Sequence, residues 1–107
     1  MTTFDKREDA FEKKFAHDAE LQFKAEARRN RQLGLWAAKL LGKSGADAEA
    51  YAKEVVAADF EKAGEEDVFA KIRRDFDAAG VDQSDHQIRR TMADLMQTAI
   101  EEIRKQS

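Results

Sequence analysis

Two histidines and their acidic neighbours are the first residues to test for chemistry. His17 and Glu20 are three residues apart, a spacing at which two side chains on one helix face can bind the same metal ion. A carboxylate-bridged centre would need a second pair of this kind, and His86 has no acidic residue at that spacing. We therefore interpret His17 as a surface or interhelical hydrogen-bonding residue, and we predict no metal site.

The densest basic cluster is the run RRNR at positions 28–31. Guanidinium groups bind phosphates and carboxylates through paired hydrogen bonds. Three members of the cluster are therefore candidates for contact with an anion or a nucleotide: Arg28, Arg29 and Arg31. The simpler interpretation is a helix face whose arginines pair with acids of the same chain. Phe23 and Trp36 lie near the cluster, but aromatic residues at helical spacing are more often core residues, so no nucleic-acid partner is expected.

Motifs of enzyme active sites are missing from the sequence. The tripeptide Gly-Lys-Ser at 42–44 lacks the glycine spacing and the preceding strand of a phosphate-binding loop. The chain has no cysteine to act as a nucleophile and no Gly-x-Ser-x-Gly turn. We predict that the protein is not an enzyme and has no catalytic residues.

A row of phenylalanines occupies one side of the N-terminal stretch. Phe4, Phe11 and Phe15 recur at i, i+7 and i+11 on a helix that is otherwise rich in charged residues. Three large aromatic side chains on such a helix are hard to explain unless another surface covers them. We predict that the stretch binds a protein partner by a helix-in-groove contact. The predicted partner-binding residues are Phe4, Arg7, Glu8, Phe11, Lys14 and Phe15. The alternative is that the stretch folds back or pairs with a second copy.

The pattern of apolar residues predicts four helices and no strands. The first runs from about residue 5 to 41 without proline, and the next three cover about 46–62, 65–79 and 85 to the C-terminal region. Gly42, Gly64 and Gly80 act as helix stops, and Ser84 with Gln87 fits a capping box. The inward face of the third helix is predicted to comprise Val68, Phe69, Ile72, Phe76 and Ala79.

The first helix is too long for the rest of the chain to cover. At 1.5 Å per residue it spans roughly 55 Å, whereas the three later helices reach only about 20 to 30 Å. We therefore predict an all-α, four-helix bundle formed by residues 19–107, with an arm formed by residues 1–18 that projects from it. An isolated helix of this length is marginal in water, so the arm is expected to be partly disordered when free and to order on its partner.

Composition places the protein in one soluble class. The chain has 107 residues, no cysteine, and 22 acidic against 19 basic residues, for a net charge of −3. This balance does not favour nucleic acid or a membrane surface, and neither a membrane span nor a signal peptide is recognisable. We expect a cytoplasmic protein that is a monomer when free.

Three linked motifs resemble a known family. FAHDAEL at 15–21, FKAEARRNR at 23–31 and LGLWAA at 33–38 together make a long signature. Over positions 14–72 the chain closely resembles the zeta inhibitor subunit of the F-type ATP synthase of alphaproteobacteria, and the similarity extends back through MTTFDKRE.

The resemblance implies an ATPase inhibitor that consists of a four-helix bundle and an N-terminal inhibitory arm. In the family this arm inserts as a helix into the catalytic head, where the α, β and γ subunits meet, and it blocks rotation in the direction of ATP hydrolysis. This chain is then expected at the cytoplasmic face of the membrane-bound ATP synthase. The family is also associated with nucleotide binding. No motif here explains that property, so we expect no cofactor and leave weak nucleotide binding open.

Two other functions remain as alternatives. One is a helical adaptor whose arm docks on a different protein. The other is a nucleotide- or RNA-binding bundle that uses the basic cluster Arg28-Arg31. Inhibition that requires residues 1–18 separates the first interpretation from both, and salt-dependent retention of nucleic acid through the arginines would favour the last.

Overall fold

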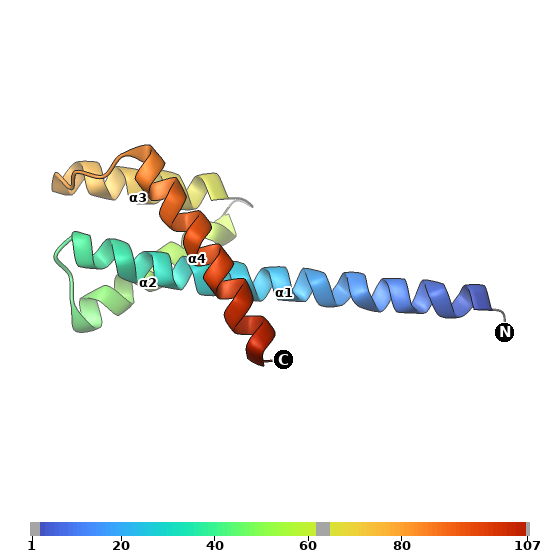
Figure 1. The fold of residues 1–107 in the computed structure, drawn as a ribbon. Helices are drawn as coiled ribbons and strands as arrows, with labels where there is room; N and C mark the ends of the chain where they lie inside the picture. The colour runs from blue at the N-terminus through green and yellow to red at the C-terminus, as the bar shows by residue number, and fades with distance from the viewer. Residues whose placement is uncertain (1–2, 62–64, 107) are drawn as a thin grey trace.

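The computed structural model describes the backbone of residues 3–61 and 65–106, and the side chains of residues 19–59 and 65–105. Over this part of the chain it contains four α-helices: α1 (Thr3–Leu40), α2 (Gly45–Glu61), α3 (Glu65–Ala79) and α4 (Asp85–Gln106). Figure 1 shows that α1 continues far beyond the other three helices toward the N-terminus. The prediction of an all-α bundle with a projecting first helix is confirmed.

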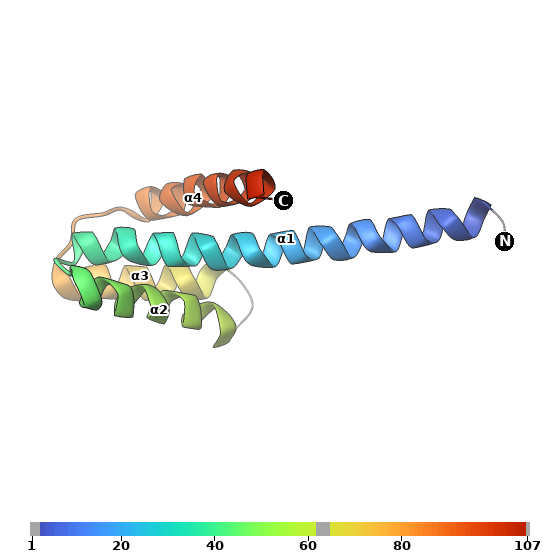
Figure 2. The ribbon, with the colours of Figure 1, turned by 90° about the horizontal axis from the view of Figure 1, so that it is seen from below.

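Helix α1 lies between the other helices. Seen from below, α4 runs along one side of α1, while α2 and α3 run along the other (Figure 2). The C-terminal end of α4 and the N-terminal end of α3 both lie toward the arm (Figures 1 and 2). The molecule measures 64 Å along its longest axis and 24 and 22 Å across, because the bundle covers only the C-terminal half of α1.

Local hydrogen bonds explain where the helices end. At the end of α1, the amide of Lys43 donates to the carbonyl of Ala38 at 2.8 Å, and Gly42 has a φ of 80°. At the end of α3, the amide of Val81 donates to the carbonyl of Phe76 at 2.9 Å. Both are Schellman motifs, which require a left-handed residue after the helix, and glycine adopts that conformation without strain.

The start of α4 is a reciprocal capping box. The amide of Ser84 donates to Oε1 of Gln87 at 2.8 Å, and the amide of Gln87 donates to Oγ of Ser84 at 3.1 Å. These bonds satisfy amides that have no partner inside the helix. The capping box that the sequence predicted is therefore confirmed.

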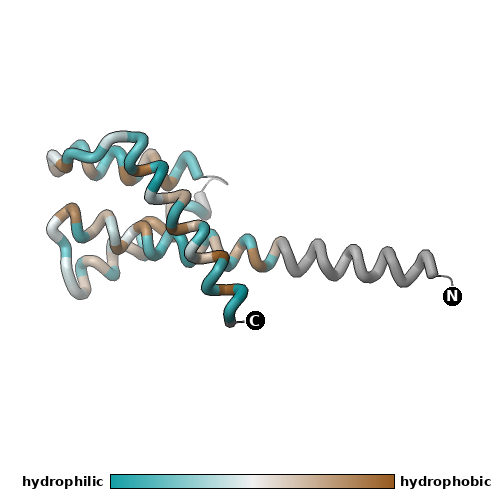
Figure 3. The backbone as a smooth tube through the Cα atoms, in the orientation of Figure 1, coloured by the Kyte–Doolittle hydropathy of each residue, from teal (hydrophilic) through white to brown (hydrophobic). Residues whose placement is uncertain are grey.

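The core lies where α1 meets the other three helices. Figure 3 shows hydrophobic positions alternating with hydrophilic ones along the helices of the bundle, as an amphipathic pattern requires. The buried core cluster comprises Leu33, Ala37, Ala38, Tyr51, Val55, Val68, Ile72, Phe76, Ile88 and Met92. Trp36 is half-buried against this cluster and meets Phe76 edge-on, with ring centroids 5.6 Å apart.

Two predicted core positions are wrong. Ala79 is exposed, because the chain reverses at Gly80 and it is Val81 that packs against the core. Phe23 is 59% exposed, because it lies on the part of α1 that has already left the bundle. Val68, Ile72 and Phe76 are fully buried, as predicted for the inward face of α3.

The contact between α1 and α2 is unusually close at Gly34. A Cβ atom built on Gly34 would lie 2.6 Å from the backbone Cα of Ala52 and 3.3 Å from Cβ of Val55. Glycine lowers helix stability relative to alanine, so its place inside α1 is explained by this approach of two helix backbones.

Candidate partner-binding arm and its anchor

The predicted partner-binding positions all belong to α1. The helix backbone begins at Thr3, so positions 4, 7, 8, 11, 14 and 15 lie on one uninterrupted helix with the bundle. The side chains of Phe4, Arg7, Glu8, Phe11, Lys14 and Phe15 lie outside the described residues, and their contacts stay a prediction. The predicted disorder of residues 1–18 in the free protein, and the candidate metal ligand His17, fall in the same range.

Between the arm and the bundle, α1 remains helical and is largely exposed, with Leu21 half-buried. Residues 22–24 are exposed, and the first buried side chain among those described is Ala25. Nζ of Lys24 lies 3.1 Å from Oε1 of Glu20, and Nε2 of Gln22 donates to Oε1 of Glu26 at 3.2 Å. Pairs at i and i+4 stabilise an exposed stretch of helix. We call residues 19–24 the connector.

About one turn after the connector, the bundle contacts α1 at a buried arginine. The side chain of Arg29 is 1% exposed, and its Nη1 donates to Oε1 of Glu65 at 2.7 Å. Its Nε also donates to Oδ1 of the buried Asn30 at 3.1 Å. A guanidinium cannot lose its charge at neutral pH, so burial requires partners of this kind. Glu65 is the first residue of α3, which ties α1 to the start of that helix.

The two other arginines of the cluster pair with the two remaining helices. Nη1 of Arg28 lies 3.2 Å from Oε2 of Glu102 in α4. Nη2 of Arg31 donates to both carboxylate oxygens of Glu49 in α2, at 3.0 and 3.2 Å. We call Arg28, Arg29 and Arg31 the arginine anchor, because within one turn they join α1 to all three other helices. The interpretation of these residues as intrachain ion pairs is supported, and an external anion would have to displace a carboxylate from each.

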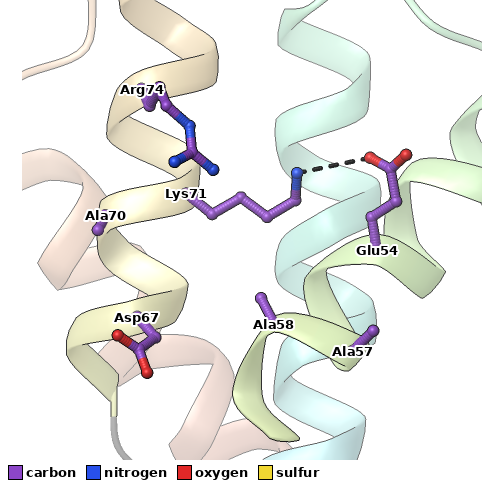
Figure 4. A pocket seen from close by; sticks show the side chains of 7 residues that line it. All are labelled: Glu54, Ala57, Ala58, Asp67, Ala70, Lys71 and Arg74. Atoms are coloured by element: carbon purple, nitrogen blue, oxygen red, sulfur yellow. Dashed lines mark hydrogen bonds and ion pairs between the residues drawn. The ribbon is translucent and has the colours of Figure 1, made fainter. Parts of the chain in front are cut away.

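A hollow of about 490 Å³ opens between α2 and α3. Figure 4 shows its lining: Glu54, Ala57, Ala58, Asp67, Ala70, Lys71 and Arg74. Nζ of Lys71 spans the hollow to Oε2 of Glu54 at 3.5 Å. The walls carry two cations, two carboxylates and three alanines, so they do not concentrate one sign of charge. This hollow therefore gives no support to weak nucleotide binding, which stays open.

A second polar group joins α2 to α3 beside this hollow. The hydroxyl of Tyr51 donates to Oδ2 of Asp75 at 2.8 Å, and Nζ of Lys71 donates to the same oxygen at 3.0 Å. Burial and the bond to Asp75 both raise the pKa of Tyr51, which stays protonated. Burial alone would raise the pKa of Asp75, but the hydrogen bonds from Tyr51 and Lys71 outweigh it and hold that pKa below its usual value. The group is a structural link rather than an acid–base pair.

The sequence alone did not predict this link. The i, i+4 spacing of Lys71 and Asp75 was a visible signal for their ion pair, but nothing local predicted that Tyr51 would reach the same carboxylate. Among the described side chains, no group of three or more His, Cys, Asp or Glu residues could hold a metal ion. No helix in the described part of the chain is both long and apolar enough to cross a membrane.

Comparisons with known proteins give a family and a similar solved structure. The family model for ATPase inhibitor subunit zeta matches residues 1–102. A protein whose structure was solved by solution NMR is 47% identical in sequence and superposes with a TM-score of 0.70, covering 81% of this chain and 99% of its own. None of the curated proteins matches this sequence. The family match includes the arm, the connector and the bundle.

Proposed function

This chain belongs to the ATPase inhibitor subunit zeta family, and we propose that it inhibits by placing the N-terminal part of α1 in a groove of the catalytic head of an F-type ATP synthase. The proposal rests on one observation. More than half of the 38 residues of α1 precede Ala25, its first described buried residue, and the phenylalanine row lies in that part of the helix (Figure 1). Among the described side chains, Phe23 and Leu40 are the exposed large hydrophobic residues, so the described part of the bundle offers no comparable apolar row.

The mechanism needs the arm to prefer one rotational state of the head. A ligand that binds all states equally shifts none of them. A helix with one apolar row meets this requirement if a groove of matching length, formed where the α, β and γ subunits meet, opens in one state only. The arm then blocks rotation in the direction of hydrolysis, because turning would have to close the occupied groove.

The phenylalanine row supplies the affinity. Burying one phenylalanine contributes about 1.5 to 3 kcal/mol, so Phe4, Phe11 and Phe15 together outweigh the cost of ordering the contact and leave several kcal/mol for binding. The charged residues between them, including Arg7, Glu8 and Lys14, fix the register of the helix more than its affinity.

The experiment is a titration of ATP hydrolysis by a purified alphaproteobacterial F-type head. The full chain should inhibit, and a chain that lacks residues 1–18 should not, although both should unfold at the same temperature. Phe11→Ala should raise the half-inhibitory concentration about tenfold or more, because 1.4 kcal/mol is a factor of ten.

Phe23→Ala is the matched control. Phe23 lies on the same helix and is 59% exposed, but it lies outside the i, i+7, i+11 row. It should leave inhibition unchanged within about threefold. If the two variants lose inhibition equally, the row is not the contact surface; if the full chain does not inhibit, the proposed function is wrong.

A further inference from the structure

The helical register connects the phenylalanine row to a described part of α1. Phe4, Phe11 and Phe15 lie eighteen residues before Gln22, Arg29 and Leu33, and eighteen residues are five turns of an α-helix. Because α1 is unbroken from Thr3 to Leu40, the two sets of positions share one side of the helix. We call this side the row face.

At its bundle end the row face meets the start of helix α3. Gln22 is exposed and Glu26 half-buried, whereas Arg29 is 1% exposed and Leu33 fully buried. Nη1 of Arg29 donates there to Oε1 of Glu65, the first residue of α3, at 2.7 Å. Among the described positions, the row face is therefore exposed at Gln22, half-buried at Glu26 and buried from Arg29 onward, where it meets the first turn of α3.

The connector sets the distance between the row and the buried Arg29. From Phe15 to Arg29 the helix rises about 21 Å. The connector contains no glycine and keeps its helical backbone while exposed, and the arginine anchor holds the next turn on three helices. Because the helix is continuous, it sets one distance and one rotation of the bundle relative to the row.

We propose that the first turn of α3 is a stop that sets how far α1 enters its partner. This inference rests on the proposed function, since the occupant of the row face is the protein groove that holds the arm. A groove wall that covers the row lies on the α3 side of α1, so its outer rim meets α3 first as the helix enters. The bundle thereby fixes which positions of the row reach the bottom of the groove.

The test moves the stop in both directions by the same amount. Deletion of residues 19–22 (AELQ) brings α3 about 6 Å nearer to the row, and duplication of the same four residues moves it about 6 Å away. Each change rotates the row by about 40° in opposite senses, so the two variants are matched in the size of the rotation and involve the same four residues. Both begin before Ala25, the first described residue that the core buries.

The expected result is asymmetric. Deletion should raise the half-inhibitory concentration of ATP hydrolysis at least tenfold, because the rim meets α3 before the row is seated. Duplication should change it by less than threefold. Thermal unfolding followed by the fluorescence of Trp36 should be the same for both variants and the unaltered chain, which excludes loss of the bundle.

Two outcomes would overturn the inference. Equal losses for deletion and duplication would mean that rotation of the row, and not the position of α3, decides binding. No loss for either would mean that the bundle never meets the partner. Failure of the unaltered chain to inhibit would refute the proposed function itself, and that result is distinct from either of these.

Discussion

Replacing Gly34 by alanine tests the packing of the bundle most directly. In α1 the change adds one methyl group, which would lie 2.6 Å from Cα of Ala52, 3.2 Å from its Cβ and 3.3 Å from Cβ of Val55. Because the nearest atom belongs to the backbone of α2, no side-chain rotation relieves the contact. The two helices must move apart.

Two opposing effects set how much Gly34→Ala changes the free energy of unfolding. Alanine is better than glycine inside a helix by about 1 kcal/mol. Extra volume in a packed core typically costs about 1 to 3 kcal/mol, and a contact with a backbone atom belongs near the upper end, at about 3 kcal/mol. The net loss in the free energy of unfolding is then about 2 kcal/mol, which lowers the midpoint of thermal unfolding by about 10 °C in a domain of this size.

This loss of stability can be measured by thermal unfolding. Circular dichroism is the first probe and the fluorescence of Trp36 is the second. Gln32→Ala is the control, since Gln32 is an exposed position of the same helix and should change the midpoint by no more than a few degrees. If Gly34→Ala were as stable as the unaltered chain or more stable, helix propensity would outweigh packing and the close crossing of α1 and α2 would not hold in solution.

Three further predictions concern polar contacts. Glu65→Ala should lower the free energy of unfolding by about 2 kcal/mol in urea titrations, because it leaves the Arg29 guanidinium buried without its carboxylate. Arg31→Ala should cost less than about 1 kcal/mol, since its ion pair with Glu49 is half exposed. Similar losses for the two variants would refute this difference between a buried and an exposed arginine. Asp75 has a lowered pKa, so its contribution to the free energy of unfolding is fully present above its unfolded pKa of about 3.9 and is lost as the pH falls through the folded value. Asp75→Asn should therefore be less stable than the unaltered chain at pH 7, and it should lose less further stability between pH 5 and 2. Identical pH profiles of stability for the two chains would contradict this. Ser84→Ala should cost about 1 kcal/mol by removing one bond of the capping box, and hydrogen exchange at the start of α4 should quicken; unchanged exchange there would argue against the cap.

Features that depend on neighbouring residues in the chain were predictable from the sequence. Gly80 as a helix stop and Ser84 with Gln87 as a capping box each depend on a few consecutive residues, and both are present as predicted. The length of α1 relative to the other helices was likewise enough to predict that one end projects.

Features that depend on how helices meet were not predictable in the same way. Gly34 interrupts a good helical sequence, and only the position of Ala52 explains it. The acids that pair with the arginine anchor come from three different helices, so the sequence indicated that partners existed but not which they were. Phe23 was placed in the core by its type, and the point at which α1 leaves the bundle decided otherwise.

The continuity of α1 also changes the energetics of helix formation in the arm. Starting an α-helix is unfavourable by a factor of about 10⁻³, whereas adding a residue to an existing helix is nearly neutral. The anchored turn at Arg29 is already helical whenever the bundle is folded, so the arm grows from an existing end. The folded bundle is thus a permanent nucleus for the helix of the arm. A free peptide with the sequence of residues 1–18 would have to nucleate anew, and it would bind more weakly than the same residues in the whole chain even if it made every contact.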